Sequence, residues 1–562
     1  MTASAEEILV GDMVAEFLQQ IGVTTAFGVI SIHNIPMLDA IGRRNTIRFV
    51  MARGEAGGGH MADAYARVSG ELGVLFTSTG PGAANACGAI VEARFAGAPM
   101  LHLTGQTATP NIDLGQGAVH DVADQLGMLK SVSKNAFRVR SAETAFGTLV
   151  KAATEAMTPP MGPISVEIPI DIQRTKIRRP AELATLRLPI PIANAGDDET
   201  LDEISKSLKA AKRPLLWIGN GAKFAGDAVA RLVDMGIPVI TSWNGRGVIP
   251  EDHPMSLGSL ATTPDVGEFL KTVDLLLVAG CRLRGHETAD MSMPLPEKMI
   301  QIDINPAANG RTYRSTIFHC AEAGAALNAI ADRLSCSGGL AIEDSLPTDV
   351  KVARAAAYEN YPKDFGPYAS FPTQMRNAMP RDAVWVRDIT LNNSTWGNRT
   401  FPLYNPRDNV YPIGAAIGPG MQLGIGAALG AKGRKVVCMC GDGGFFLNLT
   451  ELWTAVQEQI DIVFVVMNDK GYGVIKHIQS TLYGGRHFFG DLLGPNLEKL
   501  CEIAGMKYIS VDKENGLEAA VSNALEGTGP TIVEVDMKTI GDFPQYFKPP
   551  PYAESDGNEK ST

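Results

Sequence analysis

Short apolar segments alternate with longer helical patterns along almost the whole chain, and this alternation constrains the fold more than any other feature. The order strand, helix, strand is typical of parallel sheets, because a parallel pair needs a long crossover that a helix usually supplies. Strands are predicted before residue 170 at 24–30, 46–52, 73–79, 99–105 and 163–169. Two further blocks repeat the pattern, one at about 200–335 with the predicted strands RPLLWIGN, IPVITSW, DLLLVAG and MIQIDINP, and one at about 366–545 with AVWVRDIT, KVVCMCGD, DIVFVVMND and PTIVEVD. We therefore expect an α/β fold with three doubly wound parallel-sheet domains.

The segments between these blocks predict the domain boundaries. A Pro- and charge-rich segment at 177–199 has no helical or strand period, which is typical of a linker. A less regular stretch covers 336–365. The predicted units are a first domain at 1–180, a central domain at 195–335, a third domain at 366–545 and a polar, Pro-rich C-terminal tail at 546–562.

The charge balance and the length of the apolar runs restrict the partners of the chain. Lys and Arg number 50 against 61 Asp and Glu, a net charge of −11, and no basic run is present. Binding to nucleic acid needs clustered cations, so we expect no nucleic-acid partner. No apolar run reaches the roughly 18–20 residues that span a bilayer, and the N-terminus does not resemble a secretory signal. We expect a soluble, cytoplasmic protein that acts on a small molecule and does not contact a membrane.

The segment CMCGDGG at 438–444 is the most informative motif. A predicted strand ends at Cys440, and the glycine turn before the following helix, which we expect to begin near Asn448, would direct backbone N–H groups towards a diphosphate. A second strand, DIVFVVM, ends just before Asn468 and Asp469. Oxygen ligands at the tips of two strands fit octahedral Mg²⁺, which is usually bound by one or two carboxylates and substrate phosphates. The alternative is a pair of ordinary turns between strand and helix.

These motifs resemble a known family. GDGG followed by ND resembles the diphosphate and magnesium motif of thiamine diphosphate enzymes. RGEAGGGHMADAYARVSG at 53–70 and TSTGPGAANACGAIVEA at 77–93 resemble the pyrimidine-binding domain of the acetolactate synthase, pyruvate oxidase and benzoylformate decarboxylase group. RPLLWIGNGA and IQIDINP resemble the central domain of that group. The resemblance covers about residues 5–545 and implies a pyrimidine-binding domain, a central nucleotide-binding-like domain, a diphosphate-binding domain, and thiamine diphosphate with Mg²⁺ as cofactors.

The resemblance also implies roles for single residues. Glu55 matches the glutamate that hydrogen-bonds the pyrimidine ring, and we expect an apolar pocket to raise its pKa. Asp442, Asp469 and the carbonyl of Gly471 match the metal ligands, although many members carry Asn at the position of Asp469. The full set of cofactor contacts that the resemblance implies is Glu55, Thr79, Asn85, Asn392, Asn393, Ala415, Ile417, Gly443, Gly444, Asp469, Gly471, Tyr472, Gly473 and Val474.

Some of these contacts have a simpler alternative. Ile417 matches the bulky apolar residue that bends the cofactor, and the carbonyl of Ala415 would accept from the cofactor amine. The glycines of the same loop also fit plain packing at a helix start. Asn392 and Asn393 match a loop that contacts the diphosphate, but Asn is equally common in turns.

Two histidines are candidates for proton transfer. His33 corresponds to a histidine of benzaldehyde lyase-like members, and His120 stands where acetolactate synthases carry glutamine; both alternatively fit a structural role near a helix end. Pyruvate decarboxylases have a His-His pair and an acid after the metal motif, where this chain has Val119-His120 and Ile475. These absences favour transfer of the acyl unit to a second carbonyl compound over simple release of an aldehyde.

The leading prediction is a thiamine diphosphate- and Mg²⁺-dependent carboligase or 2-oxo acid decarboxylase of the acetolactate synthase type. A flavin-dependent 2-oxo acid oxidase, a lyase acting on acyloins or diketones, and a non-catalytic subunit are the alternatives. The glycines at 219, 221 and 226 do not form GxGxxG, so FAD is left open and is not predicted. Because the family shares each site between two chains, the resemblance implies a homodimer or homotetramer.

Overall fold

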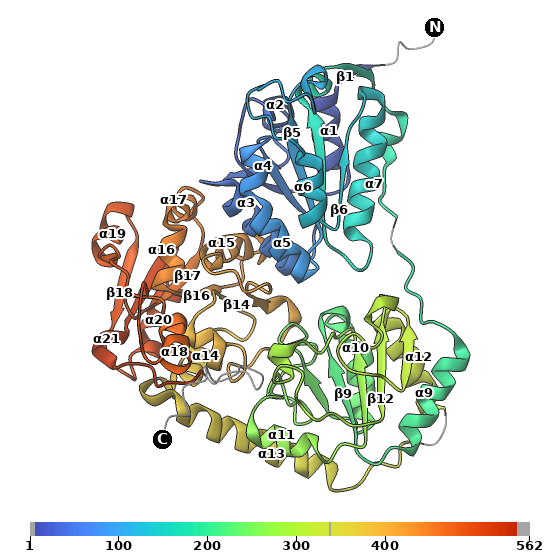
Figure 1. Cartoon of the computed structure of the whole chain (residues 1–562), viewed down its shortest axis with the longest axis vertical. Helices are drawn as coiled ribbons and strands as arrows, with labels where there is room; N and C mark the ends of the chain where they lie inside the picture. Colours follow the sequence, from blue (N-terminus) through green and yellow to red (C-terminus); the bar gives the residue numbers. More distant parts are fainter. Residues whose placement is uncertain (1–5, 190, 337–338, 548–562) are drawn as a thin grey trace, which may run out of the picture.

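The computed structural model describes residues 6–189, 191–336 and 339–547, so most of the predicted tail at 546–562 lies outside the described residues. The described residues form three domains, each built on its own parallel sheet (Figure 1). In Figure 1 the first domain lies at the top, the central domain at the lower right and the third domain at the lower left. The prediction of an α/β fold with three parallel-sheet domains is confirmed.

The first domain has a six-stranded sheet with the order β3-β2-β4-β5-β7-β6, in which all neighbours are parallel. Its strands are β2 (Thr25–Gly28), β3 (Arg48–Met51), β4 (Gly73–Thr77), β5 (Met100–Gln106), β6 (Asn135–Arg138) and β7 (Pro163–Pro169). One face is covered by α1 (Val10–Gln20), α2 (Ile35–Arg44) and α7 (Ala145–Met157), and the other by α3 (Glu55–Ser69), α5 (Cys87–Ala96) and α6 (Gln125–Val132). Helices α4 (Pro81–Asn85) and α8 (Ile170–Gln173) are short.

The third domain repeats the topology of the first. Its sheet order is β15-β14-β16-β17-β19-β18, which is the same order when the strands are counted along the chain. The strands are β14 (Val384–Arg387), β15 (Asn409–Val410), β16 (Val436–Gly441), β17 (Ile462–Asn468), β18 (Lys507–Val511) and β19 (Pro530–Asp536). One face is covered by α15 (Gly420–Gly430), α16 (Asp442–Leu447), α17 (Leu452–Gln457) and α19 (Leu497–Ala504), and the other by α14 (Phe371–Ala378), α20 (Leu517–Leu525) and α21 (Met537–Ile540). Helix α18 (Gly473–Leu482) follows the metal motif and buries no residue completely.

The central domain has a five-stranded parallel sheet with the order β10-β9-β11-β12-β13. Its strands are β9 (Pro214–Ile218), β10 (Val239–Thr241), β11 (Leu275–Ala279), β12 (Met299–Asp303) and β13 (Ile317–Cys320). Helices α9 (Asp198–Ala210), α10 (Gly226–Asp234) and α12 (Ala323–Ser335) pack on one face, and α11 (Pro264–Leu270) and α13 (Leu346–Asn360) on the other.

Two segments that looked irregular in the sequence contain regular structure. Helix α13 lies within 336–365, and it buries Leu346, Val350, Ala353 and Ala357, a spacing that places them on one helical face. The predicted linker at 177–199 overlaps β8 (Lys176–Arg178), which pairs antiparallel with β1 (Glu7–Leu9). β8 contains only 3 residues, and two of the buried residues of α13 are alanines, so neither element shows a strong hydrophobic period in the sequence.

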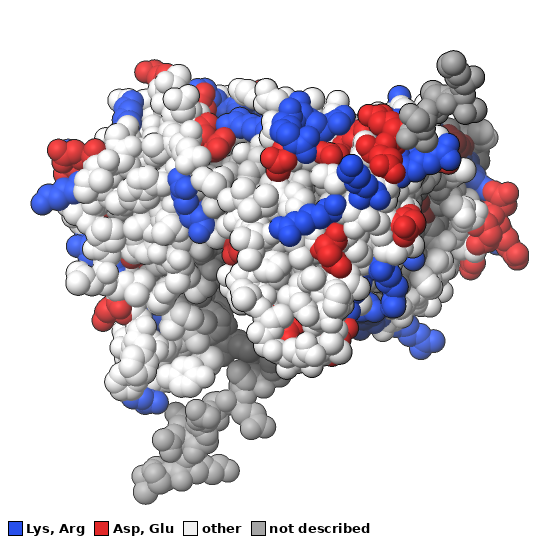
Figure 2. All heavy atoms as spheres, turned by 90° about the horizontal axis from the view of Figure 1, so that it is seen from above, with Lys and Arg blue, Asp and Glu red and all other residues white. Residues whose placement is uncertain are grey.

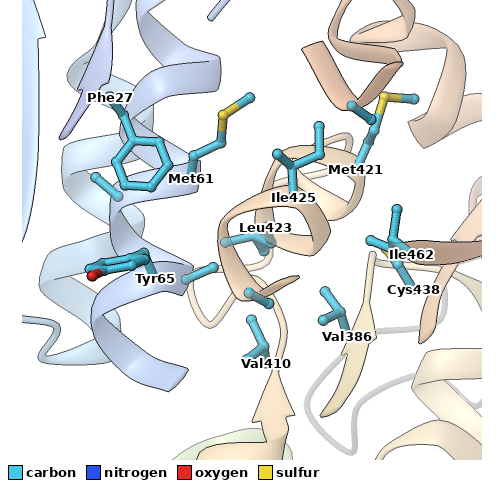
Figure 3. Packing of buried hydrophobic residues seen from close by; sticks show 14 of the residues in the cluster. Phe27, Met61, Tyr65, Val386, Val410, Met421, Leu423, Ile425, Cys438 and Ile462 are labelled. Carbon is cyan, nitrogen blue, oxygen red and sulfur yellow. The ribbon is translucent and has the colours of Figure 1, made fainter. Parts of the chain in front are cut away.

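One hydrophobic core joins the first and third domains. Helices α3 and α15 pack directly on each other, and Figure 3 shows Met61 on α3 facing Leu423 and Ile425 on α15. A Cβ atom on Gly426 would lie 2.1 Å from the carbonyl oxygen of Met61, so glycine is needed for this close approach. The packing therefore fixes the start of α3, at Glu55, relative to the loop that precedes α15.

The surface carries charges of both signs. In Figure 2, Lys and Arg are interspersed with Asp and Glu over the face that is seen from above. Within the ranges that the structure describes, no helix combines the length and apolar character needed to cross a membrane.

Candidate functional site

The GDGG turn lies where the strand order of the third sheet reverses, between β14 and β16. Open α/β sheets bind ligands in the crevice at such a point. Asp442 directly follows β16, and a Cβ atom on Gly444 would lie 2.6 Å from an oxygen of Asp388, which follows β14. A helical stretch begins after Asn448, as expected, with a 3₁₀ turn at Leu449–Glu451 that leads into α17, but an earlier short helix, α16, already begins at Asp442.

Two carboxyl groups meet at the edge of this crevice. Asp469 follows β17, the neighbour of β16, and burial together with the adjacent Asp469 carboxylate raises the pKa of Asp442 to about 7. Burial also raises the pKa of Asp469. One oxygen of Asp442, Oδ2, accepts the N–H of Gly471 at 3.0 Å, whereas the buried Oδ1 has no hydrogen-bond partner.

This donor set fits a divalent cation. A buried carboxylate with an unpartnered oxygen, Asp442, and a half-buried one that repels it, Asp469, would be relieved by a hard cation such as Mg²⁺. The described residues contain no group of three His, Cys, Asp or Glu suited to a metal, so further ligands would be backbone or diphosphate oxygens. The N–H of Gly471 donates to Asp442. The predicted role of the Gly471 carbonyl as a metal ligand stays a prediction.

Glycine is required at several positions around these carboxylates. A Cβ atom on Gly443 would lie 2.8 Å from the ring of Tyr472, and one on Gly473 would lie 2.2 Å from Oδ2 of Asp469. Glycine at these two positions therefore lets Tyr472 and Asp469 pack directly against the backbone around the carboxylates. Val474 packs partly into the core of the third domain.

Asn392 and Asn393 are buried beside the same crevice. The Oδ1 of Asn392 accepts the indole N–H of Trp396 at 2.8 Å, and the Oδ1 of Asn393 accepts from Arg387 at 2.7 Å. Neither Nδ2 group donates to another described residue. The oxygens are thus held by the fold, while the amide nitrogens are left to donate to a ligand.

The loop from Gly414 to Gly420 borders the glycine turn. Ala415 has a φ of 67°, and the side chain of Ile417 is 49% exposed. Burial raises the pKa of Asp388, which hydrogen-bonds this loop, to about 6. Asn448 donates to the carbonyl oxygen of Gly418 at 3.0 Å and thereby connects the loop to the end of α16.

In the first domain, Glu55 is the first residue of α3 and is half-buried. Its Oε2 accepts from Asn85 at 3.2 Å, and a Cβ atom on Gly82 would lie 2.7 Å from its Oε1. Thr79 is fully buried, and its hydroxyl donates to Gln125 at 2.8 Å. In one chain Glu55 therefore has a partly polar and partly open environment, and the apolar pocket expected for a site shared by two chains stays a prediction.

The two candidate histidines meet in space. The Nδ1 atoms of His33 and His120 lie 3.2 Å apart, and the ring centroids are 5.1 Å apart. Burial, His120 and Arg174 lower the pKa of His33. Neutral imidazoles can both donate and accept a proton, so the pair is suited to proton transfer at a carbonyl oxygen.

Within one chain, no hydrogen bond between described residues joins Glu55 or the histidine pair to Asp442 or Asp469. One polar link between the first and third domains is Glu451, just before α17, whose buried carboxylate accepts the N–H groups of Arg53 at 3.0 Å and Gly54 at 3.2 Å. Sequence reasoning missed Glu451, because a glutamate in TELWTA is typical of a solvated helix face.

The glycine turn of the central domain is closed by the neighbouring turn. Gly221 donates its N–H to the carbonyl oxygen of Gly280 at 2.9 Å, and a Cβ atom on Gly219 would lie 2.3 Å from the same oxygen. The N–H of Gly221 is thus used within the domain and is not directed at a phosphate. This geometry gives no support to a flavin diphosphate at the turn, and FAD stays unpredicted.

Comparison with known proteins gives consistent matches. Residues 8–128, 201–330 and 391–535 match the N-terminal TPP binding domain, the central domain and the C-terminal TPP binding domain of thiamine pyrophosphate enzymes. A probable 2-ketoarginine decarboxylase of Pseudomonas aeruginosa is 30% identical over 477 residues, which are 83% of each chain. The large subunit of acetolactate synthase isozyme 1 of Escherichia coli is 26% identical over 95% of each chain, and that of isozyme 3 is 28% identical over 95% of this chain and 96% of its own.

Proposed function

The chain belongs to the thiamine pyrophosphate enzyme family, and we propose that it uses thiamine diphosphate and Mg²⁺ to form or break a C–C bond next to a carbonyl group. The leading reaction is of the acetolactate synthase type, in which a 2-oxo acid loses CO₂ and its acyl unit joins a second carbonyl compound. The observation that carries the proposal is the pair of Asp442, which is buried, and Asp469, which is half-buried, beside a glycine turn at the switch point of the third sheet.

The chain contributes distinct groups to this chemistry. When bound, thiamine diphosphate supplies a carbon nucleophile and a place to hold the electron pair after C–C cleavage. Asp442 and Asp469 would hold Mg²⁺ against the diphosphate, and the glycine turn would let the diphosphate approach the backbone. Glu55 would hold and move a proton at the pyrimidine ring.

The histidine pair supports a second candidate, decarboxylation of a 2-oxo acid with release of an aldehyde. Aldehyde release needs a proton donor. The sequence has no His-His dipeptide, and Ile475 stands at the position where pyruvate decarboxylases carry an acid. Nevertheless His33 and His120 lie 3.2 Å apart at their Nδ1 atoms and would together hold and move a proton at the substrate oxygen. The resemblance to a probable 2-ketoarginine decarboxylase is consistent with this candidate.

We also propose that two copies of the chain share each site, as a homodimer or as a pair of dimers. Glu55 and the carboxylates share no hydrogen bond between described residues of one chain, which is consistent with a site that a second chain completes. Large apolar side chains are exposed next to each half in the sequence, as expected of surfaces that a second copy covers. They are Ile30, Ile32 and Val119 near the histidines, and Ile417, Leu447 and Ile475 near the carboxylates.

The test is a panel of 2-oxo acids, acyloins and 1,2-diketones, each supplied alone and with a second carbonyl compound, in the presence of thiamine diphosphate and Mg²⁺. Mass spectrometry of the products separates acyloin from aldehyde. Acyloin formation supports the carboligase, aldehyde alone supports the decarboxylase, and cleavage of the acyloin or diketone supports the lyase. Flavin absorbance with oxygen uptake would support the oxidase, and absence of any product would contradict the proposal.

A further inference from the structure

The loop from Gly414 to Gly420 is held from the first domain by one buried carboxylate. Glu92 lies on α5 and is 3% exposed. Its Oε2 accepts the N–H of Gly414 at 2.7 Å, and its Oε1 accepts the N–H of Ala416 at 3.0 Å. A Cβ atom on Gly414 would lie 2.7 Å from Oε1 of Glu92, so glycine allows the loop to come this close. The first domain thus holds one half of the loop.

A second buried carboxylate, from the third domain, holds the other half. Asp388 follows β14 and is fully buried. Both of its oxygens accept the N–H of Gly418 at 3.1 Å, and Oδ2 also accepts the N–H of Gly420 at 3.3 Å. Every second N–H group from 414 to 420 therefore points at a carboxylate. Ile417 lies between the two anchored halves, and its side chain is 49% exposed.

The chemistry of these contacts requires a carboxylate. Neither Glu92 nor Asp388 forms an ion pair with a described residue, so the backbone N–H groups are the compensation for burying these charges. The two oxygens of Glu92 accept from two different N–H groups. A glutamine at 92 would offer one acceptor and would place its NH₂ group against the second N–H, which leaves a buried donor without a partner.

We propose that Glu92 and Asp388 are positioning residues that fix the loop bearing Ala415 and Ile417 for the cofactor. Glu92 acts across the domain boundary, so the placement of the first domain sets the geometry of a loop that belongs to the third. This inference rests on the proposed function, in which Ala415 and Ile417 contact thiamine diphosphate. A loosened loop would bind the cofactor in a less reactive geometry rather than abolish its binding.

The experiment compares Glu92→Gln, Glu92→Asp and the wild-type full-length protein. Glu322→Gln is the matched control, because Glu322 in the central domain also accepts two backbone N–H groups, from Gly324 at 3.0 Å and Ala325 at 2.7 Å. Amide hydrogen exchange of the peptide around 412–420 is measured before cofactor is added. The affinity for thiamine diphosphate with Mg²⁺ and the deuterium exchange at the thiazolium carbon of the bound cofactor are measured next.

We expect Glu92→Gln to speed amide exchange in the loop and to slow deuterium exchange of the cofactor, each by about tenfold or more. Affinity for thiamine diphosphate should change less than the exchange rate. Glu92→Asp, which keeps two acceptor oxygens, should recover part of both effects, and Glu322→Gln should match the wild type.

Two results would overturn the inference. One is a loop that exchanges at the wild-type rate in Glu92→Gln. The other is a loop that exchanges faster while deuterium exchange at the thiazolium carbon stays unchanged. A wild-type protein that binds no thiamine diphosphate would be a different failure, because it would contradict the proposed function itself.

Discussion

The Nδ1 atoms of His33 and His120 lie 3.2 Å apart, although the two residues are separated by 87 positions in the sequence. His33 lies between β2 and α2, and His120 lies in the long loop before α6. The missing His-His dipeptide therefore does not mean that the chain lacks neighbouring imidazoles. Both histidines belong to the same domain as Glu55, and in the proposed function the pair would move protons at the substrate oxygen.

The first prediction concerns the product ratio. His120→Gln should lower aldehyde release by about 10²–10⁴ if His120 moves a proton in that step, because this is the usual loss when a general acid or base is removed. Acyloin formation should fall less, since the family places glutamine at this position in acetolactate synthases. The products of one 2-oxo acid, with and without an acceptor, provide the measurement. A variant of His286, which stacks on Trp243 in the central domain, is the control.

The second prediction concerns Glu55. Glu55→Gln should keep the fold and the affinity for thiamine diphosphate but lose turnover by about 10²–10⁴, because glutamine fills the position without exchanging the proton. Calorimetry and steady-state rates measure the two effects separately. Glu458→Gln, at a carboxylate that bonds Arg48 on the surface, is the control. Turnover within a few-fold of the wild type would rule out the assigned role.

The third prediction concerns the metal. Asp442→Ala should weaken Mg²⁺-dependent retention of thiamine diphosphate by at least about 10- to 100-fold, the loss that even indirect partners of a metal commonly cause. Titration calorimetry with and without EDTA measures the effect. Asp461→Ala, at an exposed carboxylate at the start of β17, should bind like the wild type. Equal cofactor affinity in both variants would show that the GDGG turn is purely structural.

The fourth prediction concerns acid stability. Burial lowers the pKa of His60 and of His102 to about 3, against 6.5 in the unfolded chain. Between pH 6.5 and pH 3 the unfolded chain takes up these protons and the folded chain does not. The contribution of the neutral histidines to the free energy of unfolding is therefore fully present above pH 6.5 and is lost as the pH falls towards 3. In that range each histidine should lower the free energy of unfolding by about 1.4 kcal/mol for every pH unit.

His102 allows this effect to be isolated, because its ring lies between the hydroxyls of Thr77 and Ser165, both at 2.9 Å. Glutamine can bond the same hydroxyls without titrating. The unfolding free energy of His102→Gln should therefore fall less steeply between pH 6.5 and 4.5 than that of the wild type. Parallel pH curves for the two proteins would refute the prediction.

The strands that sequence patterns missed share one physical property. β6, β13, β15 and β18 each lie at the edge of a sheet, and β1 and β8 form a two-stranded sheet in which both are edges, whereas the continuous apolar strands that were predicted lie mostly inside. An edge strand has one neighbour and is exposed along one side, so it does not need a continuous apolar run. β18, KYISV, is partly exposed, and β15 contains only two residues.

Residues of the candidate site could be predicted from the sequence where they belong to a local motif. GDGG, ND and the segment around Glu55 occur as contiguous residues at strand ends. Glu92, Asp388 and Glu451 could not be recognised, because each carboxylate bonds backbone N–H groups that lie far along the chain or across a domain boundary. Such partners leave no pattern in the sequence around the carboxylate.

The central claim is that the enzyme uses Glu55 of one chain with Asp442 of another in one thiamine diphosphate site. The most direct measurement is the activity of hybrids formed by co-expressing a Glu55→Gln chain with an Asp442→Ala chain, each inactive alone. In a hybrid dimer one site receives both intact halves and the other receives both defects, so the account predicts recovery of activity. Hybrids that are confirmed by mass and remain as inactive as the parents would contradict it.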